Sequence, residues 1–120
     1  MIDADITPKP VCLEDGDALD EFVRERDLAL VELYTAGCSK CQAMEPVLGN
    51  VARATGIPVG FVNPRDDLEL LERFDVRSVP TLILFEDGEE VARIAEGFLG
   101  AEEVLEFVRR NADGDVEFTE

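Results

Sequence analysis

Leu28-Ala29-Leu30-Val31-Glu32-Leu33-Tyr34 is an apolar run with a single acid, and it predicts a buried strand. Cys38-Ser39-Lys40-Cys41 follows shortly after this run. Apolar residues then recur at helical spacing from Met44 to Ala52, and Gly56 is typical of a helix end. The CxxC pair is therefore predicted at a strand-to-helix junction, with Cys38 at or just before the N-terminus of a helix over about 39–55.

This position favours thiol chemistry. Unpaired backbone N–H groups and the helix dipole stabilise an anion at a helix N-terminus, so Cys38 is predicted to ionise more easily than a free cysteine. Cys41 lies three residues on, within reach of a disulfide. We predict Cys38 as nucleophile and Cys41 as resolving thiol. The alternatives are two inert buried cysteines or half of a metal site, but the chain has no histidine. We expect Cys12 to be a small core residue of the first strand, with a regulatory thiol as the lesser alternative.

Length and composition indicate one folded domain. The chain has 120 residues, 46% of them hydrophobic, which is enough for a core without disulfide staples. We expect an N-terminal arm over 1–9, a domain over 10–111 and an acidic tail over 112–120. No apolar stretch reaches the length of a membrane span, and the N-terminus lacks a signal-peptide pattern. We therefore expect a soluble, cytoplasmic protein.

The charge balance is extreme, with 28 acids against 11 bases and a net charge of −17. A chain this acidic cannot form the basic patch that nucleic acids or anionic membranes require, so neither is an expected partner. The acids are dispersed, and Lys9 and Lys40 are the only lysines. This pattern favours a protein that works in molar salt, where repulsion between exposed acids is screened. We predict a halophilic source; the alternative is an unusually acidic mesophilic protein.

The remaining pattern predicts an α/β fold. The elements read βαβαβ and then αββα, with Asp87-Gly88 as a hairpin turn. Asn63-Pro64 is predicted to open a third helix whose apolar face carries Leu68, Leu71 and Phe74. Crossover helices join parallel strands, and the hairpin adds an antiparallel pair. We therefore predict a mixed central sheet in a single domain, with helices on both faces.

Several of these features together resemble the thioredoxin family over about residues 11–110. They are the CxxC at a strand–helix junction, Pro46 inside its helix, Val79-Pro80-Thr81 before a strand, the hairpin at 86–89, and the stretch from Gly97 to Phe107. The resemblance implies a thioredoxin fold. It also implies that Val79-Pro80 is a cis bond that faces the dithiol and binds an extended substrate.

Glu32 and Lys40 are further candidate site residues. An ionised carboxylate in an apolar strand is costly, so the pKa of Glu32 is expected to rise toward neutrality. This suits a proton acceptor for Cys41, a role that the resemblance supports; the alternative is that its side chain reaches solvent. Lys40 is expected to lower a thiolate pKa or guide an acidic partner, or simply to be solvated.

The chain also departs from the family pattern. Gly37 stands where the family usually has Trp, Ser39-Lys40 replaces Gly-Pro, and Phe61 stands where the buried acid usually has a lysine partner. The resemblance to the family stands despite these changes, but the redox potential and the direction of electron flow do not follow from it.

The resemblance implies a thiol–disulfide oxidoreductase that reduces protein disulfides through Cys38 and Cys41, with a redox-active disulfide and no bound cofactor. Its expected partners are disulfide-containing proteins and an electron donor such as thioredoxin reductase, and we expect a monomer. Two alternatives stay open. One is a disulfide oxidase or isomerase with a less reducing CxxC, and the other is a non-catalytic binding module.

Overall fold

The computed structural model describes residues 9–112. The arm predicted over 1–9 and the tail predicted over 112–120 therefore lie almost wholly outside the described residues. Five strands form one sheet: β1 (Val11–Leu13), β2 (Leu28–Leu33), β3 (Val59–Val62), β4 (Thr81–Glu86) and β5 (Glu89–Ile94). The helices are α1 (Gly16–Arg24), α2 (Ser39–Thr55), α3 (Glu69–Arg73), α4 (Ala101–Asn111) and a short 3-10 turn, η1 (Pro64–Asp66).

The sheet is mixed, as predicted, with strand order β1-β3-β2-β4-β5. β3 runs parallel to both β1 and β2, whereas β4 is antiparallel to β2 and to β5. β2 lies in the middle, and five of its six residues are buried. The strand that leads to the CxxC is therefore held by neighbours on both sides.

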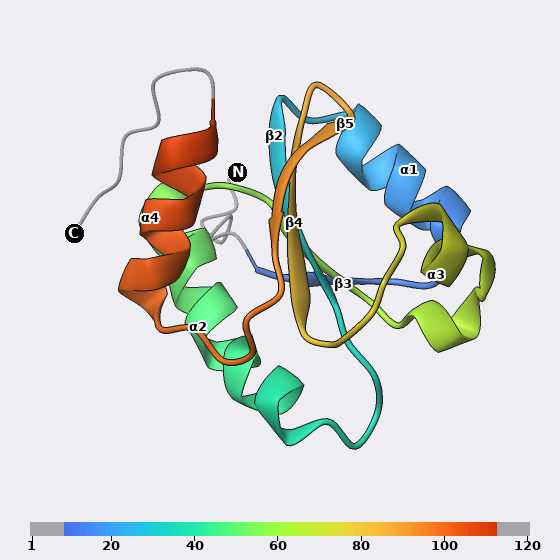
Figure 1. Ribbon diagram of the computed structural model, residues 1–120. Coiled ribbons are helices and arrows are strands. Elements are labelled where there is room, and N and C mark those ends of the chain that lie inside the picture. Colours follow the sequence, from blue (N-terminus) through green and yellow to red (C-terminus); the bar gives the residue numbers. More distant parts are fainter. Residues whose placement is uncertain (1–8, 113–120) are drawn as a thin grey trace, which may run out of the picture.

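Helices cover both faces of the sheet (Figure 1). α1 and α3 pack on one face, where Leu19 and Phe22 of α1 meet Leu70 of α3 and Phe74, the residue that follows this helix. α2 and α4 pack on the other, where Met44 and Leu48 meet residues such as Val104. Alternate residues of β2 serve the two cores, so Leu28 and Leu30 face α2 and α4 while Ala29, Val31 and Leu33 face α1 and α3. Glu32 follows Leu30 on the α2 side.

The third helix differs from its prediction. The chain first makes the 3-10 turn η1, and Asp67 then adopts an extended conformation with φ −152° and ψ 91°. This interruption changes the register of the apolar face, so Leu70 is buried whereas Leu68 and Leu71 are exposed. The prediction that Leu68 and Leu71 face the core was wrong; Phe74 is buried as predicted.

The prediction for Cys12 was also wrong. Cys12 is a free, exposed cysteine, not a core residue. It lies on β1, an edge strand of the sheet, where a neighbouring strand pairs on one side only. Of the three residues of β1, only Leu13 is buried.

Candidate active site

The two cysteines lie at the N-terminus of α2, as the sequence pattern predicts. Cys38 is the N-cap residue: its backbone is extended, and its Sγ accepts a hydrogen bond of 3.1 Å from the backbone N–H of Cys41. Gly37 enters this turn with a φ of +80°, which residues with a side chain rarely adopt. The preceding loop and the helix N-terminus therefore place one sulfur where an N–H group and the helix dipole favour negative charge.

Cys38 and Cys41 form a disulfide, with their Cα atoms 5.2 Å apart. Their exposure differs. Cys38 is half-buried and Cys41 is 2% exposed. An external thiol or disulfide can therefore reach Cys38, while Cys41 is screened by the protein.

Glu32 lies in the middle of the sheet, close to the CxxC end of β2. Its neighbours across the strands are Phe61 on β3 and Leu82 on β4, and it is only 1% exposed. This excludes the alternative that its side chain reaches solvent. Within residues 9–112 its Oε2 has no hydrogen-bond partner. Burial, and secondly the negative charge of Glu45, raise the pKa of Glu32 from 4.5 to about 8.

The Val79–Pro80 peptide bond is cis, and Pro80 is buried. The turn before it is held by the Thr81 hydroxyl, which donates a 2.7 Å hydrogen bond to the carbonyl of Ser78. Thr81 begins β4 and pairs with Leu33, the last residue of β2. Because β2 leads from Leu33 to the CxxC, the cis-proline turn and the dithiol lie at the same end of the sheet (Figure 1).

Lys40 is exposed on the first turn of α2. Its side chain extends toward the loop that joins β5 to α4: a Cβ placed on Gly97 would lie 3.8 Å from the Lys40 Nζ. The structure thus relates Lys40 to a segment far from the CxxC in the sequence.

Two residues near the site were missed by the sequence analysis. Glu45 lies one helical turn beyond Cys41 on α2, and that spacing was the available signal. Phe98 is 50% exposed and lies in the loop that Lys40 approaches. Its signal was a large apolar residue between two loop glycines, Gly97 and Gly100.

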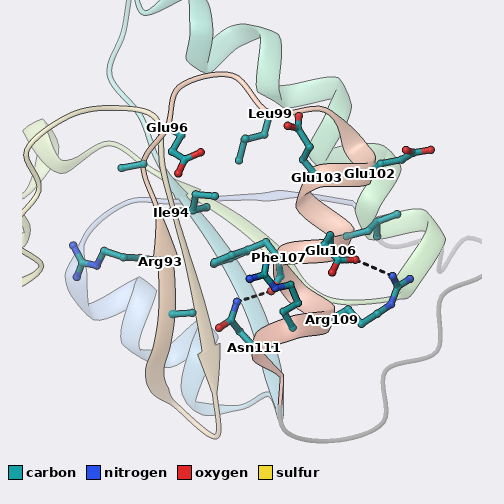
Figure 2. A pocket seen from close by; sticks show the side chains of 14 residues that line it. Arg93, Ile94, Glu96, Leu99, Glu102, Glu103, Glu106, Phe107, Arg109 and Asn111 are labelled. Carbon is teal, nitrogen blue, oxygen red and sulfur yellow. Dashed lines mark hydrogen bonds and ion pairs between the residues drawn. The ribbon is translucent and has the colours of Figure 1, made fainter.

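A groove of about 910 Å³ lies away from these residues, between β5 and α4 (Figure 2). Its lining includes Ile94, Leu99 and Phe107. Along it, Arg109 pairs with Glu106, and the Asn111 side chain donates to the Phe107 carbonyl. None of the predicted site residues lines this groove.

The described part of the chain, residues 9–112, offers neither a metal-binding group of side chains nor a membrane-spanning helix. No three His, Cys, Asp or Glu side chains gather in a way that would hold a metal ion. Within the same range, no helix has both the length and the apolar character that crossing a membrane requires.

Comparison with known proteins identifies the family. The profile of the family described as Thioredoxin matches residues 10–110, which is most of the chain. The chain belongs to the thioredoxin family. A thioredoxin from Chlamydia pneumoniae is 37% identical over 76 residues, which cover 62% of this chain and 74% of the relative. Protein disulfide-isomerase A4 from Bos taurus is 35% identical over 77 residues, covering 60% of this chain and 12% of that protein.

Solved thioredoxin structures confirm the fold prediction. A mutant thioredoxin from Halobacterium salinarum NRC-1 superposes with a TM-score of 0.81 at 27% identity, covering 89% of this chain and 94% of that one. The thioredoxin family match and the Cys38–Cys41 pair at disulfide distance together support a thiol–disulfide oxidoreductase.

Proposed function

We propose that this chain is a thioredoxin-type protein-disulfide reductase that uses Cys38 as nucleophile and Cys41 as resolving thiol. The observation that carries the proposal is the arrangement of the two sulfurs. Cys38 is reachable at the N-terminus of α2 with an N–H donated to its sulfur, and Cys41 is buried beside it. A reachable thiolate attacks first, and a screened thiol then acts only on the disulfide formed next to it.

The proposed reaction has two exchange steps. The Cys38 thiolate attacks one sulfur of a substrate disulfide; a mixed disulfide forms, and the other substrate sulfur leaves as a thiolate that solvent protonates. Glu32 then accepts the proton of Cys41, whose thiolate attacks the Cys38 sulfur. This forms the Cys38–Cys41 disulfide and releases the second substrate thiolate. Two electrons pass from the dithiol to the substrate, and a donor such as thioredoxin reductase must restore the dithiol.

Further roles belong to the same proposal. The turn at Val79-Pro80 binds the substrate backbone, because it lies at the dithiol end of the sheet. Lys40 stabilises the Cys38 thiolate through its positive charge. The protein contributes to redox homeostasis in the reducing cytoplasm of a halophile, works as a monomer and needs no bound cofactor. The halophile proposal is supported by the net charge of −17 and the two lysines of the sequence.

The test is insulin reduction driven by dithiothreitol. We expect the wild-type protein to accelerate precipitation of the insulin B chain well beyond the rate with dithiothreitol alone. Cys38→Ser should remove the acceleration, and Cys41→Ser should trap a mixed disulfide. Cys12→Ser is the matched control, because it removes an exposed thiol of β1 and should leave the rate unchanged. Equal rates with and without the wild-type protein would contradict the proposal.

A second candidate is a disulfide oxidase or isomerase, favoured by Ser39-Lys40 between the cysteines and by the similarity to part of a protein disulfide-isomerase. A cation that stabilises the thiolate stabilises the reduced form and makes the pair more oxidising. The reduction potential separates the two. A value near about −270 mV supports the reductase, and one near about −180 mV supports the isomerase.

A further inference from the structure

The loop between β5 and α4 is fixed against the first turns of α2. Gly97 lies beside Lys40: a Cβ on this glycine would stand 3.7 Å from the Lys40 Cδ and 3.8 Å from its Nζ. One turn along α2, the Met44 sulfur accepts a 3.3 Å hydrogen bond from the backbone N–H of Leu99. Leu99 itself is only 6% exposed. In Figure 1 this loop runs across α2 before α4 begins.

Phe98 lies between these two anchored residues. Gly97 and Leu99 both contact α2, and the Phe98 side chain is left 50% exposed. A single exposed aromatic residue is ordinary on a protein surface. This one, however, is held beside the helical turn that contains the dithiol. It therefore offers an approaching polypeptide an apolar surface on the loop that crosses the first turns of α2, the helix that begins at the dithiol.

Lys40 adds an available positive charge at the same place. Within residues 9–112, no carboxylate forms an ion pair with it, although the chain has 28 acids. Some arginines of this range are paired, for example Arg73 with Asp20 and Arg93 with Glu90. An exposed ammonium without a partner can bind a carboxylate of another molecule. Salt weakens such an exposed ion pair, but it also screens the long-range repulsion that the acidic surface exerts on an approaching carboxylate.

We propose that Lys40 and Phe98 together select the substrates of this protein. The favoured substrates are protein disulfides in which the attacked cysteine has a carboxylate and an apolar side chain close by in the polypeptide. The carboxylate pairs with the Lys40 ammonium, and the apolar side chain packs on the Phe98 ring. This inference rests on the proposed reductase activity and leaves its two exchange steps unchanged. It states in addition which substrate disulfides should react fastest.

The experiment uses matched peptide disulfides that differ at one flanking position, with Glu, Gln or Lys, and at a second, with Leu or Ser. The readout is kcat/KM in the dithiothreitol-driven assay. For the wild-type protein we expect the Glu peptide to exceed the Gln peptide by about threefold, as one exposed ion pair allows. We expect the Leu peptide to exceed the Ser peptide by up to about tenfold.

Variants assign each preference to its residue. Lys40→Gln should remove the Glu-over-Gln preference, and Lys40→Glu should reverse it in favour of the Lys peptide. Arg53→Gln removes an exposed charge near the far end of the same helix and should keep the preference. Phe98→Ala should remove the Leu-over-Ser preference, whereas Val91→Ala, at an exposed apolar residue of β5, should keep it.

Three results would overturn the inference. If Lys40→Gln changes kcat/KM for all peptides by one factor, Lys40 only tunes the thiolate. If the wild-type protein reduces insulin but shows no preference among the peptides, substrate selection fails and the reductase proposal stands. If neither insulin nor any peptide is reduced, the reductase proposal fails and the selection falls with it.

Discussion

The buried carboxyl group of Glu32 on β2 lies within electrostatic reach of Glu45, one turn beyond Cys41 on α2. Burial is the main cause that raises the pKa of Glu32 to about 8, and the like charge of Glu45 is the second. Phe61, not a cation, is its neighbour on β3. At pH 7 this pKa leaves Glu32 mostly protonated, so it is ready to accept a proton only in a minor fraction of molecules.

Resolution of the mixed disulfide should therefore speed up as pH rises through about 8, where Glu32 ionises. Glu32→Gln should remove this rise of the rate with pH. It should also slow resolution by roughly 100-fold, the lower end of general-base contributions. Single-turnover reduction of a fluorogenic peptide disulfide between pH 6 and 10 measures the rate. The ionisation of the cysteines remains in the variant, so the difference between the two profiles isolates the carboxyl group. Superimposable profiles would exclude Glu32 as the proton acceptor.

Glu45→Gln should move the rise of the resolution rate to lower pH. Removing the like charge makes the ionised form of Glu32 less unfavourable, so the pKa of Glu32 falls, although burial still keeps it above 4.5. The control is Glu21→Gln, which makes the same charge change on α1, on the other face of the sheet. If the pH at which the rate rises falls equally in both variants, the cause is the net charge of the protein and not Glu45.

Glu32 should also make the stability of the fold depend on pH. Below about pH 4.5 the group is neutral in both folded and unfolded chains. Between 4.5 and about 8 the unfolded chain ionises it while the fold keeps it neutral, so the free energy of unfolding falls as pH rises. Each pKa unit corresponds to about 1.4 kcal/mol, so the loss reaches a few kcal/mol at most.

Glu32→Leu should abolish this loss and be more stable than the wild type at pH 8. Guanidinium unfolding of both proteins at pH 4.5 and 8 measures the difference. Glu72→Leu, at an exposed position of α3, is the control and should leave the pH dependence unchanged. A wild type that keeps a constant stability difference from Glu32→Leu at both pH values would contradict the raised pKa.

Two glycines test how tightly the structure is packed around them. A Cβ on Gly60 would stand 2.7 Å from Leu13 Cδ1 and 3.1 Å from Phe22 Cε2, so Gly60→Ala should overpack the core and cost about 1–3 kcal/mol. Gly49, inside α2, has no atom closer than 3.6 Å to the same position, and Gly49→Ala should stabilise by about 0.5–1 kcal/mol. Denaturant midpoints at an unchanged m-value measure both. Equal shifts of the two variants would show that β1 moves away from Gly60 at little cost.

The sequence predicted the strand and helix around the CxxC well because their signals are local. Leu28 to Leu33 is continuously apolar except for Glu32, and α2 begins at Ser39 and ends at Thr55 as predicted. The prediction that Cys12 is buried failed because a three-residue strand is too short for its sequence to distinguish an edge strand from a central one. The prediction for Leu68 and Leu71 failed because the extended Asp67 interrupts a helix that the apolar spacing alone would continue.

The parts of the candidate site that come from short, local sequence patterns were predictable. Cys38 and Cys41 are close together in the chain, and a buried acid in an apolar strand is visible in the sequence as Glu32. The approach of Lys40 to Gly97 was not predictable, because it depends on how the loop after β5 crosses α2. The effect of Glu45 on Glu32 depends likewise on the packing of α2 over β2.

Salt should stabilise this fold. A net charge of −17 on 120 residues creates repulsion that favours the unfolded chain, and raising the ionic strength from about 0.1 M to 1 M shortens the screening length from about 10 Å to 3 Å. Screening also weakens favourable ion pairs such as Arg73–Asp20, whose side chains are 44% and 38% exposed. Exposed pairs contribute only about 0–1 kcal/mol each, so relief of the repulsion should exceed this loss.

The measurement is the thermal unfolding midpoint as potassium chloride is raised from about 0.1 M to 2 M, which should increase steadily. Asp20→Asn is the matched control, because it removes one acid together with its ion pair to Arg73. If repulsion dominates, this variant is destabilised at low salt by less than an ordinary ion pair would cost, and its midpoint rises less with salt than that of the wild type. A wild-type midpoint that is already maximal at 0.1 M would mean that the dispersed acids do not strain the fold, and the proposed halophilic source would lose its physical support.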